Sequence, residues 1–209
     1  MTRIFFIERI LEQLYGGKSP DSRSISHNLV NSFLNDGIAI MAKESYKENL
    51  KLDNIAYVNN SFYTSYKNLA IITGDNSNEY QSILPQIPIG IGRNEGIASA
   101  QIKVSSVLSR PVIILTPAQW NMFDLLPQPT GIPCLPEGNK LLFKSTLGLN
   151  IYTVSIRMIS GGDSTDLTSI INVPDEWFDA LNTYVLNKLL LERSQPKVNE
   201  NTGIDNTQK

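Results

Sequence analysis

The spacing of apolar residues predicts helices at both ends of the chain and strands in its centre. Apolar side chains recur at intervals of three and four over residues 3–15, which predicts an amphipathic helix with Arg3 and Glu8 off its apolar face. Gly16 and Gly17 follow directly and are expected to end this helix.

A second, longer helix is predicted over residues 24–50. The turn-forming residues 19–22 offer side-chain oxygens that cap a first helical turn. The helical phase continues across Asn35, Asp36 and Gly37, so we expect one uninterrupted helix although an interior glycine costs about 1 kcal/mol. The short connection between the two helices predicts a hairpin in which each buries its apolar face on the other.

After the second helix the pattern changes to one typical of strands. Residues 55–66 and 69–73 are rich in β-branched and aromatic residues, and a turn-forming run follows at residues 74–78. Residues 80–84 are predicted to form a further short strand. We therefore expect β structure to begin near residue 55.

Residues 84–102 link two strand-rich halves of the chain. Pro85 and Pro88 remove backbone donors, which excludes a central strand there. After Gly96 the apolar and polar positions alternate, which predicts another strand. Its core face is predicted to carry Ala98, Ala100, Ile102 and Val104.

The following segments are short and interrupted by prolines. Residues 111–115 are predicted to form an apolar strand, and residues 118–123 a brief helix with Pro117 at its first position. Residues 126–139 contain four prolines and two glycines, which predicts a long loop.

Residues 141–144 and 150–159 are predicted to pair as a hairpin. The second of these segments alternates between apolar and polar residues, so one face is expected in the core and the other in water. The apolar face carries Tyr152, Val154, Ile156 and Met158.

A last helix is predicted over residues 173–193. Pro174 stands in its first turn with two carboxylates, which favour the positive end of the helix dipole. Its apolar stripe carries Trp177, Leu181, Val185 and Leu189, widened by Phe178, Leu186 and Leu190. Such a broad face predicts packing against both N-terminal helices.

These elements predict an α+β fold in which a helical bundle carries a β-rich, sandwich- or barrel-like insertion. The expected divisions are N-terminal helices over residues 1–51, the insertion over 52–172 and the C-terminal helix over 173–193. Residues 194–209 have few aliphatic side chains and are expected to form a flexible polar tail.

Composition narrows the class of protein. The 209 residues are 41% hydrophobic and 18% charged, which is typical of a globular chain rather than a disordered one. A net charge of −2 provides no global cationic field for nucleic acid or an anionic membrane. The single Cys134 excludes an internal disulfide, and no apolar run is long enough to span a bilayer. We therefore expect a soluble protein without a signal peptide.

The glycine-rich segment at residues 90–96 superficially resembles a dinucleotide-binding fingerprint. Its last spacing is one residue too long, and a strand-like segment follows where the fingerprint requires a helix. A glycine-shaped turn between β segments is the better interpretation. Its tip, Arg93, Asn94 and Glu95, is either a solvated turn or a contact with another protein.

No residue pattern predicts catalysis, a cofactor or a metal site. The only histidine, His27, lies in a predicted helix with no carboxylate patterned beside it. Residues 163–166 lack the glycine and terminal glutamate of a calcium loop and are better explained as a turn. Glu95 and Glu176 are indistinguishable from solvated surface acids.

Trp120 and Phe123 have two interpretations. Aromatic side chains concentrate where interfaces exclude water, so the pair is a candidate anchor on a partner. Burial in the core of the chain itself is the alternative, and the sequence favours it.

Several segments together resemble a known family: RIFFIERILEQLYGG, LPQIPIGIGRNEGI, PAQWNMF, LLF with IYTVSIRMI, and INVPDEWFDALNTYVL. Over residues 1–193 the chain resembles the head-to-tail connector proteins of short-tailed bacteriophages, and most of all the ring or adaptor proteins of crAss-like phages. The resemblance rests on the order and texture of the segments, not on an invariant motif.

The resemblance implies a structural virion protein without enzymatic activity, made in the host bacterial cytoplasm. It implies a homo-oligomeric ring, twelve-fold, between the portal protein and other connector or tail proteins, around the channel through which DNA is ejected. It implies at most transient contact with DNA and none with a membrane. We expect the helices to form the ring and the β loops, including Arg93–Glu95 and residues 128–138, to contact adjacent rings.

Two other classes stay open from the sequence. The first is a soluble ligand- or carbohydrate-binding β module with helical flanks, with a pocket near Trp120 or in the tyrosine-rich segment 57–66. The second and weaker one is a hydrolase that uses a pair of carboxylates.

Overall fold

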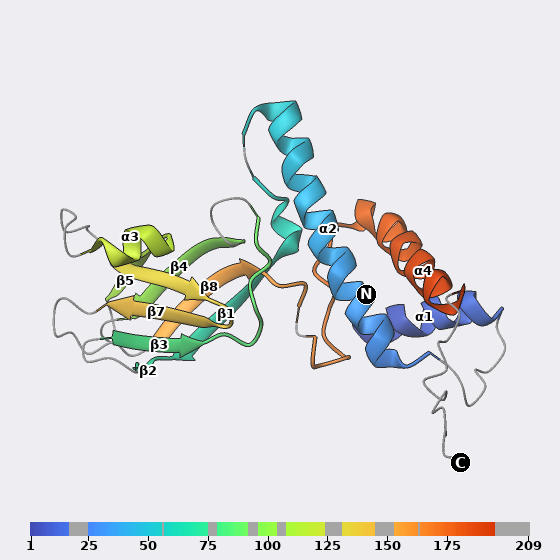
Figure 1. Ribbon diagram of the computed structural model, residues 1–209, viewed down its shortest axis with the longest axis horizontal. Coiled ribbons are helices and arrows are strands. Elements are labelled where there is room, and N and C mark those ends of the chain that lie inside the picture. The colour runs from blue at the N-terminus through green and yellow to red at the C-terminus, as the bar shows by residue number, and fades with distance from the viewer. Residues whose placement is uncertain are drawn as a thin grey trace, which may run out of the picture.

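The computed structural model describes residues 1–16, 25–55, 57–74, 79–91, 96–103, 108–123, 131–144, 153–162 and 164–194. Helices from both ends of the chain form a bundle, and a nearly closed barrel of strands lies beside it (Figure 1). This arrangement confirms the predicted α+β class with a β-rich insertion between N-terminal and C-terminal helices.

Two of the three bundle helices come from the N-terminal part of the chain. Helix α1 spans Arg3–Tyr15 and ends at Gly16, whose backbone is left-handed with φ of 62°. Helix α2 spans His27–Asp53 without interruption, as predicted. Its N-cap is Ser26, whose side chain accepts a hydrogen bond from the Leu29 amide, while the predicted cap at residues 19–22 lies outside the described residues.

The third bundle helix, α4, spans Phe178–Ser194 and follows a 3₁₀ turn, η4, at Asp175–Trp177. It contacts both α1 and α2, as the width of its apolar stripe predicts. Gly37 lies where α2 and α4 approach. A Cβ atom there would stand 2.6 Å from a Leu181 methyl and 3.0 Å from the Tyr184 ring, so the interior glycine allows the two helices to pack closely.

Eight strands lie between the helices in one sheet of order β1-β8-β4-β5-β6-β7-β3-β2. The neighbours β5 and β6 are parallel and the other pairs are antiparallel. The strands are β1 Tyr63–Ala70, β2 Ile72–Thr73, β3 Glu79–Ile83, β4 Ile97–Lys103, β5 Ser109–Ile114, β6 Ile132–Glu137, β7 Lys140–Lys144 and β8 Thr153–Ile159.

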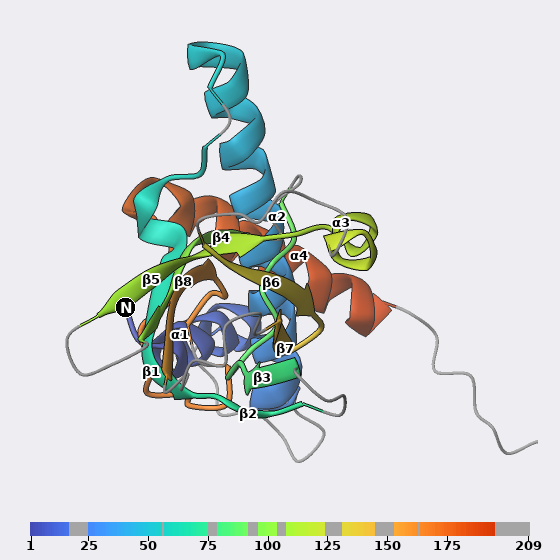
Figure 2. The same ribbon diagram turned by 90° about the vertical axis from the view of Figure 1, so that its left-hand side faces the viewer.

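One continuous segment brings the two ends of this sheet together. Strand β1 pairs with β8 at one end of the order, and β2 pairs with β3 at the other end. Only Ile71 separates β1 from β2. The segment therefore curls the sheet into a nearly closed barrel, which is visible from the side in Figure 2.

The predicted hairpin between residues 141–144 and 150–159 is wrong in its pairing. Strand β7 pairs with β6 and β3, while β8 pairs with β1 and β4. Both segments are strands, and Val154, Ile156 and Met158 are buried as the alternation predicted. The local pattern showed which face is buried, but it contains no information on which strand lies alongside.

The predicted loop at residues 126–139 is wrong from residue 132 onward, where β6 begins. This strand contains two prolines, which the sequence rules treat as strand breakers. Pro133 pairs only with β5, opposite Ile113, and Pro136 pairs only with β7, opposite Leu141. Each proline therefore has a paired strand on only one side, because the ladder with the other neighbour does not extend to it. A missing backbone donor on the unpaired side costs little.

Two strand predictions are wrong in detail. The strand expected from residue 55 begins at Tyr63, after a 3₁₀ turn, η1, at Asn60–Phe62. In β4, Ala98 is exposed because the register shifts between Ile97 and Ser99, and Ile97 takes the inward position. The bulge adds a residue that strict alternation does not count.

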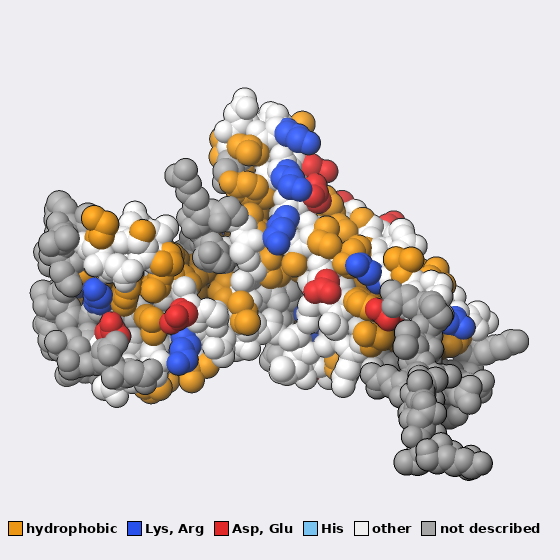
Figure 3. Space-filling view, viewed as in Figure 1, with side chains coloured by type: hydrophobic (Ala, Val, Ile, Leu, Met, Phe, Trp, Pro, Cys, Tyr) orange, Lys and Arg blue, Asp and Glu red, His pale blue; other side chains and the backbone are white. Residues whose placement is uncertain are grey.

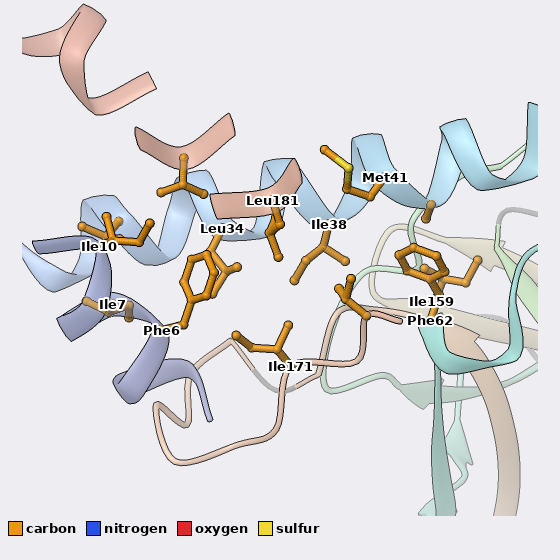
Figure 4. Close-up of a cluster of buried hydrophobic side chains, with 14 of the residues drawn as sticks. Phe6, Ile7, Ile10, Leu34, Ile38, Met41, Phe62, Ile159, Ile171 and Leu181 are labelled. Carbon is orange, nitrogen blue, oxygen red and sulfur yellow. The ribbon is translucent and has the colours of Figure 1, made fainter. Parts of the chain in front are cut away.

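The buried side chains form separate bundle and barrel cores. The bundle core gathers side chains of α1, α2 and α4 around Leu34 and Ile38 (Figure 4). The barrel core is lined by Phe143, Ile156 and other inward residues of the strands. Phe62, the last residue of η1, directly precedes β1, and Ile159 is the last residue of β8. Both lie in the bundle core, so the two parts interlock.

Candidate interaction surfaces

A buried arginine joins the bundle to the loop that follows the barrel. Arg3, expected off the apolar face of its helix, has an exposed fraction of 0%. Its guanidinium donates hydrogen bonds to Asn31 Oδ1 at 2.6 Å and to the Gly161 carbonyl at 2.7 Å. Asn31 in turn donates to the Ser164 carbonyl at 2.8 Å. The helical periodicity did not predict the burial of Arg3. A buried cation needs hydrogen-bond acceptors, and those of Arg3 come from residues distant in the sequence.

Residues 84–91 run from one core to the other. Leu84 is buried in the barrel core and Ile91 in the bundle core, and no strand is assigned between them, as Pro85 and Pro88 predicted. Gly96 has φ of 70°, and a Cβ atom there would lie 1.9 Å from the Ile89 carbonyl oxygen. This glycine is therefore required by a close backbone contact, not by a phosphate.

The candidate contact residues Arg93, Asn94 and Glu95 lie outside the described residues. The structure therefore describes the segments that flank this tip but not the tip itself. Its role in contacts between rings stays a prediction.

Trp120 lies in the short helix α3, Pro117–Asn121, and Phe123 lies two residues after its end. They are 7% and 2% exposed and form a small third cluster with Leu115. Lys144 of β7 lies over both rings, with its Nζ 5.0 Å and 5.7 Å from their centroids. This burial agrees with the core alternative, so these two side chains hold α3 on the barrel in the isolated chain.

The other candidate groups are dispersed. His27 is exposed at the first position of α2, and Glu176 is exposed in η4. Asp166 accepts hydrogen bonds from the Thr168 amide and hydroxyl, which is the turn chemistry predicted there. Within the described residues no three His, Cys, Asp or Glu side chains gather as a metal site. Cys134 is buried, and this burial raises the pKa of its thiol.

The end of α2 carries an exposed apolar surface. The helix extends past the bundle and the barrel, and hydrophobic side chains are visible along its projecting end (Figure 3). We call this surface the α2 tip. It consists of Leu50, Leu52, Ile55 and Tyr57, which are 43%, 79%, 62% and 44% exposed. Leu50 stands off the helical stripe that the core uses, which is the one signal of this surface in the sequence.

A second exposed apolar surface lies where α4 ends, beside α1 and at the far end of the bundle from the α2 tip (Figure 1). Leu190, predicted to widen the buried face of α4, is 51% exposed, and the adjacent Leu191 is 60% exposed. We call these two residues the α4 end. The bundle thus carries exposed apolar side chains at both of these places, in addition to Phe5 of α1 and Ile40 of α2, which are 58% and 39% exposed.

Comparisons with known proteins assign the chain to no family. It matches no protein-family model and no curated protein sequence. None of the helices in the described part of the chain is both long and apolar enough to cross a bilayer.

Proposed function

We propose that this protein is a ring subunit of the head-to-tail connector of a tailed phage. In this role it joins the portal to the tail and surrounds the channel through which DNA leaves the capsid. The observation that carries the proposal is the pair of exposed apolar surfaces, the α2 tip and the α4 end, at opposite ends of the helical bundle.

Two different surfaces are what a ring requires. A ring closes through head-to-tail contacts in which one surface of a subunit binds a different surface of the next. A monomer rarely leaves clustered aliphatic side chains in water, because burying each one contributes roughly 1.5–3 kcal/mol. We infer that the α2 tip of one copy packs against the α4 end of its neighbour.

The fold supports the same proposal. The connector resemblance implies a helical bundle with a β-rich insertion, and the chain has this arrangement. The barrel stands to one side of the bundle, so its outer surface is available to contact a ring above or below (Figure 1). With Trp120 and Phe123 buried, the region of α3 offers other side chains to such a partner, among them Met122 directly after the helix, at 54% exposure.

The first experiment measures assembly. Native mass spectrometry and negative-stain electron microscopy of the purified chain, alone and with the portal protein of the same phage, should show a closed ring, expected to be a dodecamer. A chain that stays monomeric alone and also fails to bind the portal under assembly conditions would contradict the proposal.

Variants locate the contact. Leu52→Asp with Ile55→Asp places two charges on the α2 tip and should shift the ring to monomers. The matched control is Ile72→Asp with Ile83→Asp on the barrel, whose side chains are 48% and 55% exposed. If the control disrupts the ring as strongly as the α2 tip variant, the helices do not form the contact.

No specific observation favours the alternative of a ligand-binding β module. The interior of the barrel is occupied by its own side chains, including Leu141, Phe143 and Met158, all 0% exposed. Trp120 is also covered. The connector therefore remains the proposed class.

A further inference from the structure

The two halves of the barrel differ in charge. Strands β2, β3, β6 and β7 contain two acids, Glu79 and Glu137, together with Lys140 and Lys144. Strands β1, β4, β5 and β8 contain Lys67, Lys103, Arg110 and Arg157 and no acid. Basic and acidic side chains lie close together over the β3 and β7 region of the barrel in Figure 3.

The absence of acidic residues from strands β1, β4, β5 and β8 extends to the segments that flank these strands. Residues 96–123 and 138–162 contain no Asp or Glu, although the whole chain has 20 acidic and 18 basic residues. These two stretches therefore carry only positive charges although the net charge of the chain is −2. A local positive field can arise there despite the overall balance.

Strand register shows which of these side chains lie on the outer face. In β4 and β8 the inward positions are taken by core residues such as Ile102 and Ile156, so the residues between them point outward. Two cross-strand rows result. One row joins Ser65, Arg157 and Ser99, and the other joins Thr153 with Lys103. Gln101 and Ser155 form a pair between these rows.

We call this outer face of β1, β8 and β4 the hydroxyl face. Its members are Ser65, Lys67, Ser99, Gln101, Lys103, Thr153, Ser155 and Arg157. All are exposed or half-buried, and Lys67 is exposed beside a bulge of β1. Arg110 is not part of it, because its register partner Ile102 faces the core. The hydroxyl face thus combines three cations with small neutral hydrogen-bonding groups.

Arg157 is held in position on this face. Its guanidinium lies 5.1 Å from the centroid of the Tyr63 ring and donates a hydrogen bond to Asn60 Oδ1 at 3.2 Å. That bond uses one of the five N–H donors of a guanidinium, whose forked shape matches a phosphate. Lys103 lies in register with Thr153, four residues along β8 from Arg157, a separation of about 13 Å at ~3.3 Å per residue.

We propose that the hydroxyl face binds the phosphate backbone of double-stranded DNA without reading its sequence. Lys, Arg, Ser, Thr and Gln are the side chains that supply backbone contacts in protein–DNA complexes. The separation of Lys103 and Arg157 is close to the ~12 Å width of the major groove, so the two cations can contact phosphates on its two sides. The face lacks the exposed aromatic platform on which single strands stack their bases.

The contact between one copy of the chain and DNA is expected to be weak, because only three cations contribute to it. Binding releases about three counterions, so the logarithm of the association constant should fall with the logarithm of the salt concentration with a slope of roughly −3. Copies arranged around one duplex would strengthen it through effective concentration. The idea that several copies surround one duplex rests on the proposed function. The inference that the hydroxyl face binds DNA rests only on the residues of the sheet.

The test uses the purified chain and a fluorescein-labelled 30-base-pair duplex of arbitrary sequence, with anisotropy measured between 25 and 200 mM NaCl. Lys67→Gln with Lys103→Gln should raise Kd on the order of tenfold at the lowest salt and make the slope shallower by about 2. The control, Lys140→Gln with Lys188→Gln, removes the same charge from other surfaces and should leave both values unchanged. An equal loss in the two double variants would overturn the inference, as would absence of salt-dependent duplex binding by the parent chain.

Two further probes separate other polyanions. Oligo(dT) of the same length should bind more weakly than the duplex, and vesicles containing phosphatidylserine should not compete for the duplex. Tighter binding of oligo(dT), or vesicle binding that Lys67→Gln with Lys103→Gln abolishes, would reject duplex DNA as the partner. Mass measurement on the same samples, with and without the portal protein, keeps the two proposals distinct. A ring that does not bind DNA overturns only this inference. A chain that binds DNA but stays monomeric alone and does not bind the portal overturns only the ring.

Discussion

The bundle core and the barrel core bury similar aliphatic and aromatic side chains, but they are encoded differently along the chain. In the bundle each helix shows its buried face through its own 3.6-residue period, so α2 was predicted across Gly37 as one helix. In the barrel a period of two shows the inward face, yet pairs such as Tyr63 with Ile159 join residues far apart in the sequence. Local sequence patterns therefore define the helices and strands. The pairing of strands in the barrel depends on contacts between residues that are distant in the sequence.

The strongest test of this comparison removes one large aromatic side chain from each core. Phe62→Ala and Phe143→Ala should each lower the free energy of unfolding by about 3–5 kcal/mol, because both side chains are 0% exposed. We expect each variant to weaken amide protection in both parts, since Phe62, directly before β1, and Ile159, at the end of β8, lie in the bundle core. Denaturant unfolding and hydrogen exchange measure the two effects.

A different outcome would separate the two cores. If Phe143→Ala weakened protection in the strands and left α2 unchanged, the barrel and the bundle would unfold independently. The packing of Phe62 in the bundle core would then not couple the unfolding of the barrel to that of the bundle.

The next largest effect is expected at the junction. Arg3→Leu should lower the free energy of unfolding by about 3 kcal/mol, because it leaves the buried Asn31 Oδ1 and the Gly161 carbonyl without their donor. Arg9→Leu is the matched control on the same helix, and as a substitution of an exposed side chain it should change stability by less than about 0.5 kcal/mol. Equal effects in urea unfolding would show that the Arg3 contacts do not stabilise the junction.

Gly37→Ala tests the packing of α2 on α4. Alanine favours a helix by about 1 kcal/mol over glycine, but its Cβ would meet Leu181 at 2.6 Å. We expect a net loss of roughly 1–2 kcal/mol from overpacking, measured by thermal or urea unfolding. In a Leu181→Ala background the same substitution should cost less, and a cost that does not change would place the clash elsewhere.

The smallest effect is expected at the third cluster. Lys144→Met keeps most of the side-chain stem but removes the charge over Trp120 and Phe123, which should cost about 1 kcal/mol. Lys140→Met on the same strand is the control. Urea unfolding followed by tryptophan fluorescence measures both, and an unchanged midpoint for Lys144→Met would assign no stabilising role to this contact.

The sequence predicted most elements and few of their partners. Helix α1 was predicted with its observed bounds, and the brief helix with Pro117 at its first position was also correct, although it ends at Asn121 instead of residue 123. The parallel pairing of β6 was missed because Pro133 reads as a strand breaker, and its tolerance depends on how far each neighbouring ladder extends. The false hairpin between β7 and β8 arose because adjacency along the chain was taken for adjacency in the sheet.

The candidate surfaces were harder to predict than the fold. Trp120 and Phe123 were suitable by residue type for a partner contact, and only the folded arrangement shows them to be covered. The α2 tip left a faint trace in the position of Leu50, while the hydroxyl face needed register to show that Lys103 and Arg157 share one side of a sheet. A surface made of residues from several helices or strands produces no periodic pattern in the sequence, so sequence periodicity does not predict it.

The segment that carries β1 and β2 brings the two edges of the sheet close together. Free backbone donors and acceptors at an edge act as a template for another chain, and crowded copies of an open sheet risk fusing into aggregates. Because β1 pairs with β8 and β2 with β3, only a short seam separates β1 from β3 among the described strands. Where the sheet closes on itself, contacts with another protein are made by side chains, which can be specific where a bare strand edge is not.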